Sequence, residues 1–168
     1  MNLQQIIFKA QQSKFHLRLL NLGLNRGIPF NRPHGFKILQ FQKHEIKTLL
    51  PYKKKNLNHI KGLHACALAT LTEFTAGVML ISKLDPKQYR LILKDLFMEY
   101  HFQGKKNAYA TFTIDDEWVK TNVLEVIAGG SPALVKCTVE IKDQDDNLLS
   151  TGTTHWQIKS WEQVKTKM

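Results

Sequence analysis

One stretch of the chain, residues 62–82 (GLHACALATLTEFTAGVMLIS), is almost wholly apolar and rich in small residues. A helix that is apolar on every side is normally buried, so this stretch predicts a long central helix that ends before Asp85-Pro86. A run of this length can also cross a bilayer. However, it is rich in Ala, Thr and Gly, contains the acid Glu73 and stands alone in the sequence, so we expect no transmembrane segment.

The segments before the central helix predict one helix and two strands. Residues 3–21 have an apolar side and predict a helix that Gly23 and Gly27 end. Residues 35–50 predict a strand, a bend and a second strand, followed by a polar loop over residues 51–61. The expected buried members of these two strands are Phe36, Ile38, Leu39, Phe41, Ile46, Leu49 and Leu50.

The segments after the central helix predict mostly strands. A long strand is expected over residues 90–102, on which Asp95 and Glu99 would face solvent, and a second strand over 108–114. Asp115-Asp116-Glu117 would open a short helix that runs to Ile127, because acidic residues suit the first turn of a helix. Residues 133–142 and 148–159 then predict a hairpin.

This order of elements predicts an α+β protein with a single long helix wrapped by an antiparallel sheet. We divide the chain into residues 1–28, an N-terminal helix and connection, and residues 29–168, the main domain. A sheet that packs on a buried helix still exposes its edges, and dimerisation is the usual way to cover them.

The charge of the chain is strongly positive, with 24 Lys and Arg against 14 Asp and Glu, a net +10. Such a field attracts nucleic acid, acidic lipid head groups or phosphorylated small molecules. The basic residues are scattered, with one short cluster at Lys53-Lys54-Lys55, and no basic stripe interleaved with aromatic residues occurs, so we expect no nucleic-acid partner.

The N-terminus and the cysteines bear on location. Before Glu45 there is no acidic residue, as in transit peptides, but we favour a basic amphipathic helix lying on the domain. Two cysteines make no disulfide framework, which fits a reducing, cytoplasmic compartment. The seven histidines show no metal-ligand spacing, and we expect neither a metal nor a cofactor.

The residue that most needs explaining is Glu73, because a buried acid costs several kcal/mol unless it is paired, hydrogen-bonded or useful. It lies nine residues after His64, which lies six residues after Asn58, and Gly77 follows it. Cys66 has no partner spaced for a Cys-His mechanism, so we interpret it as an inert small residue.

This spacing, within NHIKGLHACALATLTEFTAG, resembles the signature of hotdog-fold acyl-CoA thioesterases of the phenylacetate-degradation type. The resemblance spans about residues 29–160 and is closest to a poorly characterised thioesterase-like branch that often has an extra N-terminal helix. It implies a hotdog fold and hydrolysis of acyl-CoA thioesters. The family's His-Gly-Gly is replaced here by His64-Ala65-Cys66, which alters the place where a thioester carbonyl would bind.

The resemblance also implies roles for particular residues. Glu73 would activate water as a general base or attack directly, and the backbone N–H of Ala65 would polarise the thioester carbonyl. Asn58 would orient the water or the carbonyl, and His64 would be mostly structural. Lys53, Lys54 and Lys55 would contact the phosphates of coenzyme A, unless they are simply a solvated loop.

Helix geometry separates these residues within one chain. Nine residues rise about 13.5 Å and turn through about 900°, which is half a turn out of phase, so His64 and Ala65 cannot meet Glu73 around one carbonyl. A shared site therefore requires two subunits, and we expect a homodimer or homotetramer. Two alternatives remain open: a non-catalytic acyl- or lipid-binding hotdog module, which the altered His-Ala-Cys favours, and an acyl-thioester dehydratase.

Overall fold

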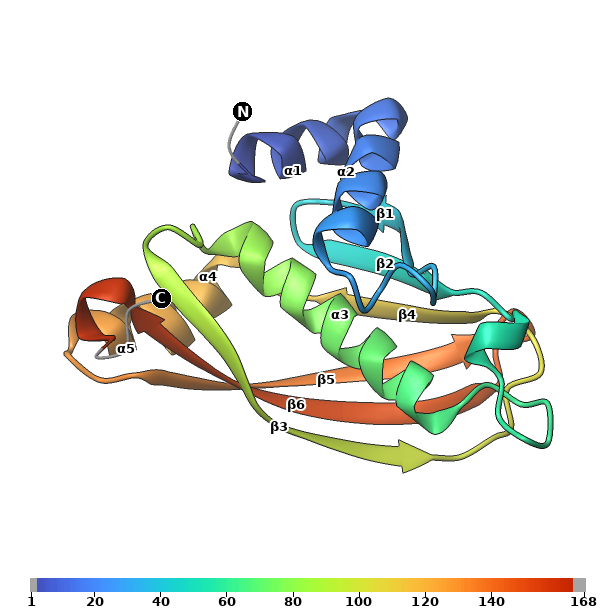
Figure 1. The fold of residues 1–168 in the computed structure, drawn as a ribbon. Helices are drawn as coiled ribbons and strands as arrows, with labels where there is room; N and C mark the ends of the chain where they lie inside the picture. Colours follow the sequence, from blue (N-terminus) through green and yellow to red (C-terminus); the bar gives the residue numbers. More distant parts are fainter. Residues whose placement is uncertain (1–2, 165–168) are drawn as a thin grey trace.

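The computed structural model describes residues 3–164 and shows helices lying against one face of a six-stranded sheet (Figure 1). The elements, in chain order, are α1 (Leu3–Gln12), α2 (Lys14–Gly27), β1 (Lys37–Phe41), β2 (Glu45–Leu50), the 3₁₀ turn η1 (Lys54–Asn56), α3 (Ala65–Lys83), β3 (Tyr89–Tyr100), β4 (Ala108–Thr113), α4 (Asp116–Val119), the π-helical turn η2 (Lys120–Leu124), α5 (Glu125–Ala128), β5 (Ala133–Asp143), β6 (Leu148–Ser160) and the 3₁₀ turn η3 (Trp161–Gln163).

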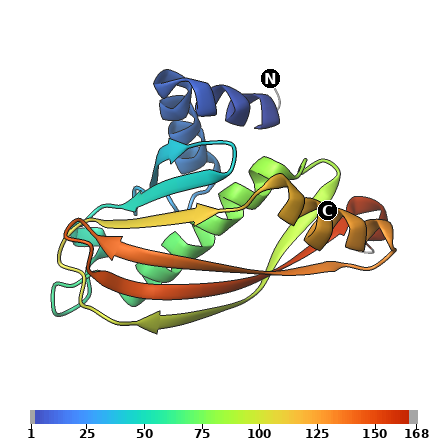
Figure 2. The same ribbon diagram turned by 180° about the vertical axis from the view of Figure 1, so that it is seen from behind.

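The sheet has the order β1-β2-β4-β5-β6-β3, and every neighbouring pair is antiparallel. Helix α3 crosses one face, and the view from behind shows the sheet wrapped round it (Figure 2). On β5 every second residue is buried against the core, from Ala133 to Ile141. The prediction of a hotdog fold, in which an antiparallel sheet wraps a long central helix, is confirmed.

The central helix and the sheet approach each other closely at two glycines. A Cβ atom built on Gly152 of β6 would lie 2.5 Å from the side chain of Thr72 on α3. A Cβ atom built on Gly77 of α3 would lie 3.0 Å from the ring of Trp156 on β6. Glycine at these positions therefore sets how tightly α3 packs on the sheet. Within the described part of the chain, α3 is the helix that is long and apolar enough to cross a membrane, and most of it is buried in the fold.

The N-terminal segment is helical and ends at Gly27, as predicted, but it is not one helix: there are two, and the second runs through Gly23, which does not end it. The helices separate at Ser13, whose backbone is extended (φ −142°, ψ 125°). The break lets each helix reach a different part of the core. Gln4 on α1 donates to the backbone carbonyls of Ile81 and Leu84 at the end of α3, whereas α2 lies along β1.

The prediction that Leu39 is buried is also wrong, since its side chain is exposed. The pairing of β1 with β2 shifts from Ile38 opposite Thr48 to Gln40 opposite Lys47, which leaves Leu39 without a partner. This bulge keeps Ile38 and Phe41 on the buried face and turns Leu39 outward.

The remaining elements agree with the sequence. The predicted strands correspond to β2, β3, β4, β5 and β6, and Asp95 and Glu99 on β3 are exposed. The short helix after β4 is present as α4, η2 and α5, and the side chain of Asp115 caps its start by accepting from the backbone N–H of Trp118.

Candidate functional site

The side chain of His64 forms the N-terminal cap of α3. Its backbone is extended (φ −69°, ψ 137°), and its Nδ1 accepts a hydrogen bond from the backbone N–H of Cys66 at 3.1 Å. The backbone N–H of His64 donates to the carbonyl oxygen of Asn56 at 2.8 Å, which fixes the loop before the helix. The geometry of His64 is therefore that of a helix cap, with Nδ1 engaged by the backbone.

Ala65 is the first residue of α3, and its backbone N–H has no acceptor among residues 3–164. It points from the positive end of a 19-residue helix, where backbone N–H groups favour negative charge. Ala65 lines a groove of about 290 Å³ together with Asn58, Leu63, Leu68, Tyr100, His101, Phe102, Gln103 and Gly104. The structure therefore brings Asn58 and Ala65 to one groove.

The side-chain oxygen of Asn58 accepts hydrogen bonds from the loop, and its side-chain nitrogen has no partner among the described residues. Its Oδ1 accepts from the backbone N–H groups of Ile60 (3.1 Å) and Gly62 (2.9 Å). Its amide nitrogen, Nδ2, has no acceptor in the part of the chain that is described. The loop thus fixes the amide plane, and the nitrogen remains as a hydrogen-bond donor in the groove that Ala65 also lines.

The end of β3 forms the other wall of the groove, which no pattern in the sequence predicts. The hydroxyl of Tyr100 donates to the carbonyl oxygen of Ala65 at 3.1 Å, and the N–H of Leu63 donates to the carbonyl of Gly104 at 2.8 Å. Burial, with a smaller contribution from Cys66, raises the pKa of Tyr100, which keeps the hydroxyl protonated. The spacing of residues does not predict the contact of Tyr100 with Ala65, because it depends on where the sheet places β3 relative to α3.

Glu73 lies further along α3, outside this groove. Its side chain is largely but not fully buried, and it has no ion pair or hydrogen bond within the described chain. Burial raises the pKa of its carboxyl group above the ordinary value of 4.5. Its Oε1 lies 3.8 Å from the point where a Cβ on Gly77 would sit. One chain thus brings Asn58 and Ala65 together and leaves Glu73 apart.

The three lysines lie before and within η1, and none of them lines the groove. All three are exposed. The ammonium group of Lys53 lies beside Gly35, where a Cβ would sit 2.6 Å from its Nζ. Partial burial and the nearby charges of Lys55 and Lys37 lower the pKa of Lys53. The contact of these lysines with a phosphate stays a prediction.

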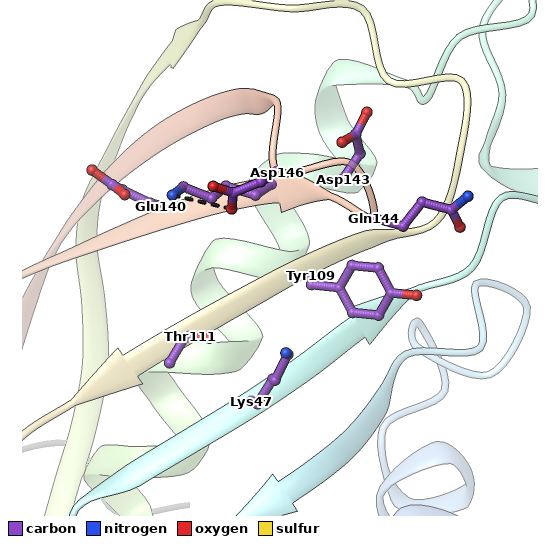
Figure 3. Close-up of a pocket in the computed structure, with 8 residues that line it drawn as sticks. Lys47, Tyr109, Thr111, Glu140, Asp143, Gln144 and Asp146 are labelled. Atoms are coloured by element: carbon purple, nitrogen blue, oxygen red, sulfur yellow. Dashed lines mark ion pairs between the residues drawn. The ribbon is translucent and has the colours of Figure 1, made fainter.

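A second depression lies on the other face of the sheet, away from α3 (Figure 3). It has a volume of about 680 Å³ and mixed charge, and its lining includes Lys47, Tyr109, Thr111, Glu140, Lys142 and Asp146. Two of its charges pair with each other, Lys142 with Asp146 at 3.3 Å, and the ammonium group of Lys47 lies over the Tyr109 ring. Across residues 3–164, no three His, Cys, Asp or Glu side chains are grouped to hold a metal ion.

The chain is similar to one family model and to several solved structures. A family model described as a domain of unknown function, DUF4442, matches residues 17–158. A Pseudomonas aeruginosa protein of unknown function, described as a probable thioesterase, is 19% identical, with 85% of this chain and 95% of that chain covered and a TM-score of 0.78. A Chlorobaculum tepidum protein of unknown function is 13% identical, with coverage of 92% and 94% and a TM-score of 0.73.

A thioesterase of Haemophilus influenzae is 12% identical, with coverage of 89% of this chain and 94% of that chain and a TM-score of 0.69. A search of curated proteins finds no match. At these identities the likeness concerns the fold, which is the hotdog fold of thioesterase-like proteins.

Proposed function

Since this chain belongs to the DUF4442 family, a domain of unknown function, we propose an activity for it from the residues around α3. The proposed activity is hydrolysis of acyl thioesters such as acyl-CoA, at a site that two copies of the chain share. The thioesterase names of two proteins with the same fold support the reaction class.

In this proposal the groove at the start of α3 holds the thioester carbonyl. The unpaired N–H of Ala65 and the free amide nitrogen of Asn58 donate to the carbonyl oxygen as it gains negative charge. Glu73 takes a proton from water, and the water attacks the carbonyl carbon. The C–S bond then breaks, and the thiolate leaves and takes the proton back from Glu73. Direct attack by the carboxylate, followed by hydrolysis of the anhydride, uses the same groups.

The geometry favours a second copy as the source of the carboxylate. Glu73 lies about 13.5 Å along the helix from His64 and faces the other way, so it does not reach the groove of its own chain. Strand β3 is an edge of the sheet, 12 residues long, with exposed Ile92 and Phe97. An unpaired edge of this length favours antiparallel pairing with a second copy.

The observation that carries the proposal is the unpaired carboxyl of Glu73 in an apolar helix. A module that only binds an acyl chain gains nothing from an acid at this position, because burying it without a partner costs stability. A catalyst does gain, because a pKa raised toward neutrality makes the carboxylate a better base. Such a perturbed acid without a structural partner is typical of an active site.

The proposal is tested by hydrolysis of a panel of acyl-CoAs that differ in chain length and aromatic character. Loss of the thioester's ultraviolet absorbance is the better readout, because the exposed Cys66 would react with thiol reagents. Glu73→Gln should lose about 10²- to 10⁴-fold in kcat. The matched control is Glu117→Gln, which removes an exposed acid from α4 and should leave kcat unchanged.

Two results would contradict the proposal. Full activity in Glu73→Gln would remove this residue from the mechanism. Tight acyl-CoA binding by the wild-type protein, measured by calorimetry, with no hydrolysis across the panel would make the chain a binding module instead.

A further inference from the structure

The N-terminal part of the chain carries positive charge with no acidic residue to offset it. No Asp or Glu precedes Glu45. The Lys and Arg residues of this part are Lys9, Lys14, Arg18, Arg26, Arg32, Lys37 and Lys43. The site proposed above uses none of them, so this concentration of charge needs its own explanation.

Helix α2 has two apolar sides. One contains Leu20, which is buried in the core, with Leu17 and Leu24 packed against it. The other contains Phe15, Leu19 and Leu22, which are 64%, 44% and 51% exposed. Spacings of three and four residues place these three on one face of the helix.

The outer side of α2 also carries positive charge. Arg18 and Arg26 follow Phe15 by three and eleven residues, which puts both on its side of the helix, and both are exposed. Aromatic and aliphatic groups thus alternate with guanidinium groups on this outer face. Phe8 on α1 (59% exposed) and Phe30 just after α2 (61% exposed) are further exposed aromatic side chains of the N-terminal part.

A groove adjoins this face. It lies between α2 and β1, has a volume of about 540 Å³, and is lined by Lys14, Leu17, Arg18, Asn21, Leu22, Asn25, Lys37, Ile38 and Leu39. Its lining thus combines leucine and isoleucine side chains with three basic residues, Lys14, Arg18 and Lys37. The bulge at Leu39 turns an apolar side chain toward this groove rather than into the core.

Pairing of two copies through β3 would leave this face uncovered. Helix α2 packs on β1, at one edge of the sheet, whereas β3 forms the opposite edge (Figure 1). Exposed Phe and Leu side chains are therefore left in water, where a contiguous apolar patch indicates a binding partner.

We propose that the N-terminal basic surface, formed by Phe15, Arg18, Leu19, Leu22 and Arg26 on the outer face of α2, binds the surface of an anionic lipid bilayer. Helices that lie in a membrane interface place Phe and Leu among the acyl chains and Lys or Arg among the phosphates. The all-basic charge of residues 1–44 complements an anionic leaflet. This proposal does not depend on thioester hydrolysis and is tested without it.

The test is co-sedimentation of the full chain with lipid vesicles at physiological ionic strength. Vesicles of phosphatidylcholine with phosphatidylserine should bind the protein, and vesicles of phosphatidylcholine alone should not. Arg18→Gln with Arg26→Gln should weaken binding about 30-fold, because each basic group near such a surface contributes about fivefold. The matched control, Lys105→Gln with Lys136→Gln, removes the same charge from exposed positions elsewhere and should bind like the wild type.

A second readout locates the contact. Phe15→Trp should be quenched by brominated lipid, whereas Leu134→Trp, on the exposed face of β5, should not. Phe15→Ser with Leu22→Ser should abolish binding, with an unchanged circular dichroism spectrum as the check on folding.

Three outcomes would overturn the proposal: no binding to either vesicle, equal loss in the control pair, or equal quenching at both tryptophans. A fall in oligomeric size in Phe15→Ser with Leu22→Ser would also overturn it, because the surface would then join copies of the chain.

Discussion

Glu73 is a residue whose position costs stability in the folded chain. Neither an ion pair nor a hydrogen bond compensates its burial within residues 3–164, and its carboxylate lies beside Gly77. Functional residues are commonly held in environments that favour reactivity over stability. This trade-off can be measured separately from catalysis.

Replacement of Glu73 by Gln should stabilise the protein at neutral pH. Because the pKa of Glu73 is raised on folding, the folded chain holds the proton more tightly than the unfolded chain. The cost of the ionised form is absent below the ordinary pKa of 4.5 and fully present above the raised pKa. Glu73→Gln should therefore melt at a higher temperature than the wild type at pH 8, and the gap should close as pH falls below about 4.5. A gap that is independent of pH would contradict this account.

Ala65 permits a test that separates its N–H from its side chain. Proline is tolerated at the first position of a helix, and His64 already has the extended backbone (ψ 137°) that a following proline requires. Ala65→Pro should thus fold normally but lose the donor to the thioester carbonyl, lowering kcat by about 10²- to 10³-fold.

The control for this test is Ala65→Ser, which keeps the N–H and should retain kcat within a few-fold. Equal activity in Ala65→Pro and Ala65→Ser, with both melting like the wild type, would exclude the N–H of Ala65 from catalysis.

At the scale of elements, the contact of α3 with β6 depends on a missing side chain. A methyl group at Gly152 would overlap the side chains of Thr72 and Met98, so Gly152→Ala should cost about 1–3 kcal/mol of unfolding free energy. Gly23 provides the contrast, because it lies within α2 with no atom within 4 Å of an added Cβ. Gly23→Ala should therefore add about 1 kcal/mol. Urea denaturation measures both, and equal effects would contradict the close contact.

The elements that the sequence predicts correctly are those with one strong local signal. The central helix follows from its apolar run, and the strands follow from alternation. The prediction of a single N-terminal helix fails at Ser13. The break there lets Gln4 contact α3 and Asn21 contact β1, and both contacts are distant in sequence. No local pattern contains this information. Gly23 disfavours the helix by only about 1 kcal/mol relative to Ala, which is too little to end α2 at this residue.

In the candidate site, too, the sequence predicts the residues that share one helix and misses a residue that another element brings in. Spacing predicts His64 at the start of the helix and Glu73 out of reach of Ala65, and the structure agrees on both positions. It does not predict Tyr100, because the end of β3 meets the start of α3 only through the order of strands in the sheet. The functions of these residues stay predictions.

At the scale of the whole molecule, the two edges of the sheet differ. The β1 edge is covered by α2, where Asn21 accepts from the N–H of Ile38 and donates to its carbonyl, and Asn25 donates to the carbonyl of Phe36. The β3 edge has no such cover among the described residues. One open edge permits a closed pair of copies but not a growing chain of them.

A closed pair gives the sharpest test of a shared site. Asn58→Ala and Glu73→Gln should each be nearly inactive alone, because every site in either dimer lacks one group. In a mixed dimer, one site combines wild-type Asn58 from one copy with wild-type Glu73 from the other, and the second site lacks both. If the two proteins are denatured together and refolded in equal amounts, half of the dimers are mixed, so about one quarter of the wild-type activity should return. A site contained within one chain would give no recovery at all, since neither chain would carry both groups.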